Sequence, residues 1–113
     1  MVAAVAAFLK ERVLTLQELG VKDIILDPGI GFGKTLEHNL DLIINIGRFK
    51  ALGYPLMLGV SRKSFIGAIS GAPAQERLGG TIAACVMGAL NGADILRVHD
   101  AVEVKQALAV AFR

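Results

Sequence analysis

Hydrophobic positions along the chain alternate between the spacing of a helix and the continuous runs of a buried strand. The first apolar residues recur every three or four positions, which predicts an amphipathic helix that ends at Gly20. A second helix is predicted from Thr35, as the N-cap, to about Leu52, with Gly53 after its end. The inward faces of these two helices are predicted to be Val2, Val5, Leu9, Val13, Leu16 and Leu19, and then Leu36, Leu40, Ile43 and Ile44.

Two more helices are predicted in the second half of the chain. One covers about 76–90 and follows a predicted loop at 61–75. The other begins at Asp100, which forms a capping-box pattern with Glu103. The inward face of this last helix is expected to consist of Val104, Leu108 and Phe112.

Three short apolar runs predict strands at 22–27, 54–60 and 93–98. The predicted order is αβαβαβα, with three parallel strands and four helices. Continuous apolar strands joined by helical crossovers are typical of a parallel sheet covered by helices, so the fold class is α/β. Ligands bind at the carboxyl ends of the strands in such folds, whether the sheet is open or closed into a barrel.

The composition narrows the class of function. With 113 residues, of which 54% are hydrophobic, the chain fits a single domain over 1–113 with its own core. The formal net charge of +2 and an aromatic content of 5% argue against a nucleic-acid partner. No apolar run predicts a membrane span. Cys85 lies in an apolar helical pattern and is predicted to be a buried, inert thiol, so a reduced, cytoplasmic setting is expected.

Polar groups follow all three predicted strands. The first ends at Asp27, the second is followed by Ser-Arg-Lys-Ser at 61–64, and the third leads into Arg-Val-His-Asp at 97–100. Because parallel strands end at a common edge, one acid and several basic groups are expected to converge there. Arg97 and His99 are two positions apart and would face the same side of an extended segment. This combination predicts an anionic ligand, since arginine suits phosphate oxygens.

The segment LDPGIGFGKT at 26–35 has the glycines of a phosphate-binding loop but the wrong spacing. A Walker loop that ends in the Gly-Lys-Thr at 33–35 would need glycine at the position of Pro28. A dinucleotide fingerprint that begins at Gly29 would need glycine at the position of Lys34. Each glycine of such loops has its own backbone task, so nucleotide binding is not expected here.

Four motifs, LDPGIGFGKTLEHNL, GVSRKSFIG, ERLGG and GADILRVHD, resemble the closing half of the dihydropteroate synthase family, and the resemblance covers about 2–112. It implies an eight-stranded (β/α) TIM barrel and a transferase of folate biosynthesis. That reaction condenses 6-hydroxymethyl-7,8-dihydropterin pyrophosphate with 4-aminobenzoate and yields 7,8-dihydropteroate and pyrophosphate. The resemblance also implies Mg²⁺, whose usual asparagine ligand has no counterpart in this chain.

The resemblance assigns the pterin and aminobenzoate contacts to four residues. Asp27 would bind the amino-pyrimidine edge of the pterin, where a carboxylate can accept two hydrogen bonds. Lys63 would contact the pterin and line the 4-aminobenzoate pocket, Ser64 would help to hold the aminobenzoate carboxylate, and Phe32 would form a wall of that pocket. The plainer alternatives are a loop cap for Asp27, a solvated side chain for Lys63 and a core residue for Phe32.

The same resemblance assigns pyrophosphate to Arg97 and His99, and it also places Arg97 against the pterin. Lys63, Arg97 and His99 are therefore the candidate catalytic residues, with a structural histidine as the alternative for His99. The pyrophosphate leaving group is already good, so the site needs to position the amine and stabilise charge rather than supply a nucleophile.

Among the remaining polar residues, His38 is expected to face solvent and Asp100 to cap a helix, and Ser61 and Arg62 are expected to shape their loop.

The chain is short for this family, because a (β/α) barrel takes about 250 residues. It would supply strands six, seven and eight only, and would leave apolar sheet edges and an open barrel face. Self-association, or association with the remaining barrel portion, is therefore expected, and the chain alone is expected to be inactive or nearly so. Two alternatives stay open: a non-catalytic binding or scaffold module with a partial pterin and pyrophosphate site, and the pterin-binding domain of a folate-dependent methyltransferase.

Overall fold

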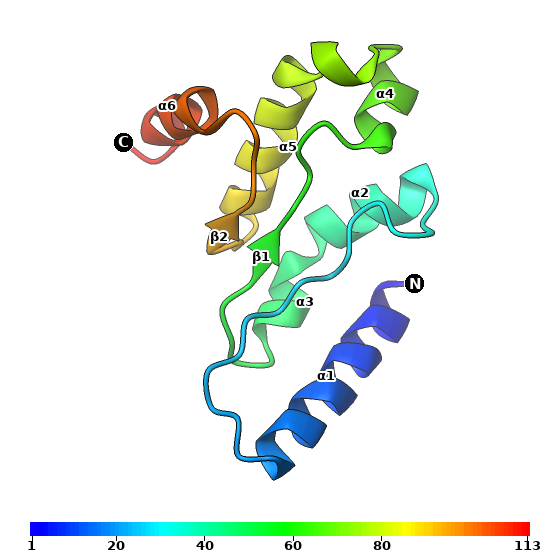
Figure 1. Ribbon diagram of the computed structural model, residues 1–113, viewed down its shortest axis with the longest axis vertical. Coiled ribbons are helices and arrows are strands. Elements are labelled where there is room, and N and C mark those ends of the chain that lie inside the picture. The colour runs from blue at the N-terminus through cyan, green and yellow to red at the C-terminus, as the bar shows by residue number, and fades with distance from the viewer.

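The structure is a computed structural model that describes residues 1–113. Six α-helices, one short 3-10 helix and two strands follow one another along the chain (Figure 1). In order they are α1 (Val2–Glu18), α2 (Leu36–Ile44), α3 (Ile46–Lys50), β1 (Met57–Leu58), α4 (Ser64–Ser70), the 3-10 helix Ala74–Glu76, α5 (Leu78–Leu90), β2 (Ile95–Leu96) and α6 (Ala101–Ala111).

The sheet is parallel, as predicted, but it is smaller than predicted. β1 pairs with β2 in a register that places Met57 opposite Ile95. The predicted first strand contributes a single bridge, in which the Leu26 N–H donates to the Pro55 carbonyl and the Leu26 carbonyl accepts from the Met57 N–H, both at 2.8 Å. The pairing of this segment is thus confined to the bridge between Leu26 and Leu56, one residue before β1.

The predicted helix over 35–52 is divided into α2 and α3 at Asn45. Its start is confirmed, because the Thr35 hydroxyl accepts a hydrogen bond from the His38 N–H at 3.2 Å. At the break, the Asn45 side-chain amide donates to the Asp41 carbonyl at 2.8 Å, and the Asn45 backbone turns to φ −101° and ψ 23°. A local side-chain bond of this kind competes with the helical ladder and ends the helix.

The segment predicted as a loop, 61–75, contains α4 and most of the 3-10 helix. α4 forms because Phe65 and Ile66 are buried, and it ends at Gly71, whose φ of 76° lies in the left-handed region. The prediction of a loop was wrong because seven residues with a glycine among them show too little helical periodicity to be recognised. α5 consequently begins at Leu78, two residues later than predicted.

The last helix differs from its prediction at both ends. The Asp100 side chain makes no capping hydrogen bond, and its carboxylate instead pairs with Arg62. The predicted capping box is therefore wrong, because a guanidinium from a distant loop takes the carboxylate that would have capped the helix. Val104 is buried and Leu108 is half-buried as expected, whereas Phe112 is 56% exposed rather than inward.

The core lies on one face of the sheet. The helices form one layer beside it, in which α1 adjoins α2 and α3, α2 adjoins α5, and α5 adjoins α6 (Figure 1). Gly88 allows α5 to approach β1, since a Cβ there would collide with the side chain of Leu58. Cys85 is fully buried, as predicted, and burial raises the pKa of its thiol to about 11.

The opposite face of the sheet carries no helix. Leu56, Leu58 and Val60 point into the core and are fully buried, whereas the alternate residues of the neighbouring segments are open to solvent. Ile25 is 56% exposed and Ile95 37% exposed. Side chains alternate across a sheet, so one face is packed and the other is an open apolar surface, as the sequence led us to expect. No helix of the structure is long and apolar enough to cross a membrane.

Candidate functional site

The glycine-rich loop that follows the Leu26 bridge is held by its own side chains. The Asp27 carboxylate accepts a hydrogen bond from the Gly29 N–H at 2.9 Å, and the side-chain oxygen of the buried Asn39 accepts one from the Gly31 N–H at 2.8 Å. The Lys34 ammonium donates to the Gly29 carbonyl at 2.8 Å and to the Phe32 carbonyl at 3.3 Å. Two backbone N–H groups that a phosphate loop would offer to an anion are thus already in use.

Lys63 connects this loop to the end of β1. Its ammonium donates to the Ile30 carbonyl and lies 4.6 Å from the centroid of the Phe32 ring. Gly31 passes close to the same side chain, since a Cβ at Gly31 would lie 3.1 Å from Lys63 Cδ. The Phe32 ring is 71% exposed and therefore lies at the surface, not in the core.

Partial burial lowers the pKa of Lys63 from its ordinary value. The negative charge of Asp27 opposes this shift, while the positive charges of Arg97 and Lys34 add to it. These groups come from three different chain segments, so the shift records the convergence of one acid and several cations that the strand ends predict. A perturbed lysine in a polar concavity is a frequent feature of functional sites.

A polar pocket of about 200 Å³ lies between the ends of β1 and β2. Arg97 lies over Gly59, where a Cβ would be 3.1 Å from its Nη2 atom, and it forms no ion pair with a side chain of this protein. The lining is strongly basic and includes no carboxylate. Its residues are Gly59, Ser61, Lys63, Arg97, Val98 and His99.

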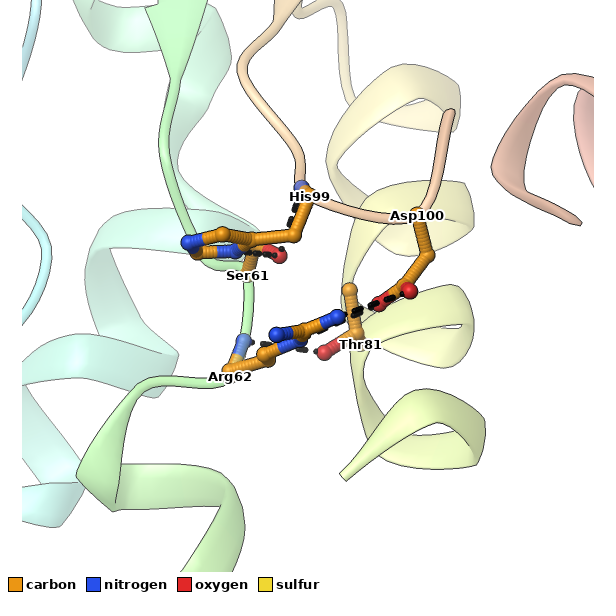
Figure 2. Close-up of polar contacts among 5 residues, drawn as sticks. All are labelled: Ser61, Arg62, Thr81, His99 and Asp100. Atoms are coloured by element: carbon orange, nitrogen blue, oxygen red, sulfur yellow. Dashed lines mark hydrogen bonds and ion pairs between the residues drawn. The ribbon is translucent and has the colours of Figure 1, made fainter. Parts of the chain in front are cut away.

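Two pairs of side chains join the loop after β1 to the loop after β2 (Figure 2). The Ser61 hydroxyl lies 2.8 Å from His99 Nδ1 and accepts the His99 backbone N–H at 3.1 Å. Arg62 donates to Asp100 through Nε at 3.2 Å and through Nη2 at 2.9 Å, and the carboxylate raises the pKa of Arg62. The sequence placed Ser61 and Asp100 at the strand ends, but residue types and spacing did not reveal that Ser61 would line the pocket beside His99 or that Asp100 would pair with Arg62.

The structure brings some of the predicted residues together and leaves others apart. Lys63, Arg97 and His99 share the basic pocket. Asp27 and Phe32 line a neighbouring groove of about 440 Å³ between the glycine loop and α1. Ser64 is exposed at the start of α4 and lines neither space. The side chain of His38 is half-buried on α2 and not fully solvent-facing as predicted.

No group of three or more His, Cys, Asp or Glu side chains that could hold a metal ion is present. Magnesium prefers oxygen ligands such as carboxylates, and the basic pocket offers none. The residues of this chain therefore do not by themselves form a magnesium site.

The sequence of this chain is similar to those of known pterin-binding enzymes. A family model described as pterin binding enzyme matches residues 1–99. The chain is 52% identical over 102 residues to the dihydropteroate synthase of Clostridium beijerinckii, covering 88% of this chain and 38% of that protein. It is 39% identical over 110 residues to the Escherichia coli dihydropteroate synthase, covering 96% and 39% respectively.

Solved structures give the same result for the fold. Dihydropteroate synthase from Coxiella burnetii, in complex with pteroic acid, superimposes on this chain with a TM-score of 0.94 at 36% identity. The superposition covers 97% of this chain and 42% of the Coxiella chain. The enzyme from Thermus thermophilus, in complex with 4-aminobenzoate, superimposes with a TM-score of 0.94 at 42% identity and covers 98% and 46%. The fold is thus an α/β part of the dihydropteroate synthase TIM barrel.

The chain belongs to the pterin-binding enzyme family. Within that family it groups with the dihydropteroate synthases, enzymes of folate biosynthesis, as the four sequence motifs indicated. It spans about two fifths of the length of the curated relatives that it matches, at 38% and 39% in the two cases given above.

Proposed function

We propose that this chain provides the pyrophosphate-binding part, and one side of the pterin site, of a cytoplasmic dihydropteroate synthase. Its substrates would be 6-hydroxymethyl-7,8-dihydropterin pyrophosphate and 4-aminobenzoate. The observation that carries the proposal is the convergence of Lys63, Arg97 and His99 on one pocket without a carboxylate, in a chain of this family. In this proposal residues 1–113 are one segment of the barrel and supply its strands six to eight.

The polyanionic end of the substrate would lie in the basic pocket. Arg97 has no ion-pair partner in the protein, so its guanidinium is available for a bidentate contact with phosphate oxygens. The flat face of the same guanidinium would stack on the pterin ring. His99 would add a hydrogen bond from its imidazole. Lys63 would supply a second positive charge, beside that of Arg97, at the boundary between the pyrophosphate and the pterin.

The aromatic substrates would lie toward the glycine loop. The Asp27 carboxylate is exposed and keeps acceptor capacity beyond its bond to the Gly29 N–H, so it can accept donors from the pterin edge. The exposed ring of Phe32 would form a wall for 4-aminobenzoate beside Lys63. Ser64, at the start of α4, would reach the aminobenzoate carboxylate.

The reaction would need positioning and charge stabilisation and no protein nucleophile. The amine of 4-aminobenzoate displaces pyrophosphate at the methylene carbon of the pterin, and negative charge accumulates on the leaving group. The fixed charge of Arg97 and the donors of Lys63 and His99 would stabilise that charge in a pocket already arranged for it. Magnesium would be held by phosphate oxygens and by groups outside this chain, since the chain lacks a site of its own.

The open face of the sheet limits what the chain can do alone. Ile25 and Ile95 lie on the face that would be the interior of a closed barrel, and both are exposed. We expect this face to be covered by a second copy of the chain or by the remaining barrel portion. A stable, monodisperse monomer in light scattering would contradict this expectation.

Calorimetric titration with pyrophosphate tests the proposed anion site. Arg97→Ala should weaken binding by about tenfold, since a charge-assisted bidentate contact contributes more than about 1 kcal/mol. Arg48→Ala, on the exposed surface of α3, is the matched control and should bind as the wild type does. Equal affinities for the wild type and Arg97→Ala would remove the support for the pocket.

An assay of dihydropteroate formation separates catalysis from binding. The chain alone should give little or no product from the two substrates with magnesium, and addition of the remaining barrel portion of a relative should restore product. A normal rate from the chain alone would overturn the claim that the other strands are needed. Binding without product under both conditions would favour the second candidate, a non-catalytic pterin and pyrophosphate module.

A further inference from the structure

The Ser61 hydroxyl is in a position to determine which nitrogen of His99 carries the proton. Ser61 is 8% exposed, and its oxygen has two neighbours on the same residue: the His99 backbone N–H at 3.1 Å and His99 Nδ1 at 2.8 Å (Figure 2). A backbone N–H can only donate, so one lone pair of the hydroxyl oxygen is already engaged. The hydroxyl proton of Ser61 still needs an acceptor.

A serine hydroxyl carries one proton and two acceptor lone pairs. His99 Nδ1 is the side-chain nitrogen within hydrogen-bond distance of Ser61 Oγ, and a hydroxyl with so little exposure has few alternatives in water. When the hydroxyl donates to Nδ1, both polar atoms are satisfied and the neutral ring must carry its own proton on Nε2. The reverse tautomer, with a proton on Nδ1, would leave the serine proton without this partner.

We propose that Ser61 is a positioning residue that holds neutral His99 in the tautomer protonated at Nε2. The ring then presents an N–H donor, and not a lone pair, to the pocket that it shares with Lys63 and Arg97. An unprotonated nitrogen facing an anion would repel it, whereas a donor stabilises it. This inference deepens the proposed anion site and rests on it for its functional meaning.

The loop that carries Ser61 is held in place by other residues. The Arg62 N–H donates to the Thr81 hydroxyl at 3.0 Å, and the Arg62 carbonyl accepts from Arg77 at 3.0 Å, which fixes Arg62 at a φ of 55°. The Arg62 guanidinium binds Asp100 on the partner loop. Removal of the Ser61 hydroxyl also releases the His99 backbone N–H, and these neighbouring contacts should keep the two loops together when that bond is lost.

Nitrogen NMR of the 113-residue chain tests the proposal directly. The chain contains two histidines, so the ring nitrogens of His99 can be assigned against those of His38. In the neutral ring, His99 should show a protonated Nε2 and an unprotonated Nδ1. Ser61→Ala should shift His99 toward a mixture of tautomers, and Ser61→Thr should restore the single form. Ser70→Ala, which removes a hydroxyl that donates to the Ile66 carbonyl, is the control and should leave His99 unchanged.

Pyrophosphate affinity provides a second, independent measurement. Ser61→Ala should weaken binding about fivefold, the loss expected for one misdirected hydrogen bond, and Ser61→Thr should recover most of it. A protonated Nδ1 in the wild type, or identical tautomer populations in the wild type and Ser61→Ala, would overturn the proposal. Failure of the wild type to bind pyrophosphate would contradict the proposed anion site instead, and the NMR result would still decide the role of Ser61.

Discussion

The ammonium nitrogen of Lys63 lies 4.6 Å from the centroid of the Phe32 ring, and the two residues come from loops that follow different strand segments. This contact couples the glycine loop to the basic pocket. The ring stabilises the charged form of the lysine, while partial burial of Lys63 favours the neutral form and lowers its pKa. We therefore expect the protonation of Lys63 to depend on its contact with Phe32.

Phe32→Leu should lower the pKa of Lys63 further, because it removes the ring that favours the ammonium. An exposed cation–π contact contributes about 0.5–1 kcal/mol, which corresponds to about half a pKa unit. A nitrogen-detected NMR titration of the lysine side chains measures this change. Phe112→Leu, another exposed phenylalanine, should have no effect on Lys63. An unchanged or raised pKa in Phe32→Leu would refute the coupling.

Lys63 should also make stability depend on pH at the alkaline end. Its pKa is lowered in the folded chain from an ordinary value of 10.5, so the unfolded chain binds more protons between the two values. The free energy of unfolding should therefore rise as the pH increases through this interval. Urea unfolding of the wild type and Lys63→Met between about pH 8 and pH 11 measures the difference. The rise should be absent in Lys63→Met and present in Lys10→Met, and equal slopes in all three would contradict the prediction.

Asp94→Asn should destabilise the chain at neutral pH. The Asp94 carboxylate accepts from Lys50 Nζ at 2.5 Å and from the Leu56 N–H at 2.9 Å, and both bonds lower its pKa below 3.8. This contribution is present above the unfolded pKa and is lost as the pH falls through the lower folded value. The melting temperature of Asp94→Asn should be lower than that of the wild type at neutral pH. The two should converge in strong acid, whereas Asp41→Asn, an exposed residue of α2, should match the wild type throughout.

Gly88→Ala should lower the free energy of unfolding by about 1–3 kcal/mol, the usual cost of overpacking a core. Its new methyl group would collide with the fully buried side chain of Leu58 in the layer between α5 and β1. Gly79→Ala lies in the same helix with open space around it, so it should leave stability unchanged or raise it by up to about 1 kcal/mol. Urea unfolding compares the two variants. A Gly88→Ala chain as stable as Gly79→Ala would mean that α5 and β1 are less tightly packed than the structure indicates.

Some features that depend on residues close together in the sequence, such as the helix cap at Thr35, were predicted correctly. Thr35 caps its helix and Cys85 is buried, because each depends on residues within one or two turns. The predictions at Asn45 and Asp100 are wrong for opposite reasons. The break at Asn45 is local, but a single amide in an apolar helical pattern is a weak signal. The carboxylate of Asp100 is taken by Arg62, which is 38 residues away in sequence, and no local pattern contains that information.

One part of the candidate site was predictable, because the carboxyl ends of parallel strands meet at one edge of the sheet. Lys63, Arg97 and His99 share a pocket for that reason. The pairing of Ser61 with His99 requires the side-chain rotamers of two loops, which the sequence does not specify. The reduction of the first strand to the Leu26 bridge was not predicted either, because an apolar run indicates strand propensity and not how many ladder positions will pair.

The internal bonds of the glycine loop have a thermodynamic consequence for ligand recognition. Lys34 and Asn39 already hold the backbone at Gly29 and Gly31, so the loop has its shape before a ligand arrives. Ordering a flexible loop on binding would cost about 1–2 kcal/mol of conformational entropy per residue. A loop whose backbone is already held by these bonds avoids part of that cost when a ligand binds against it.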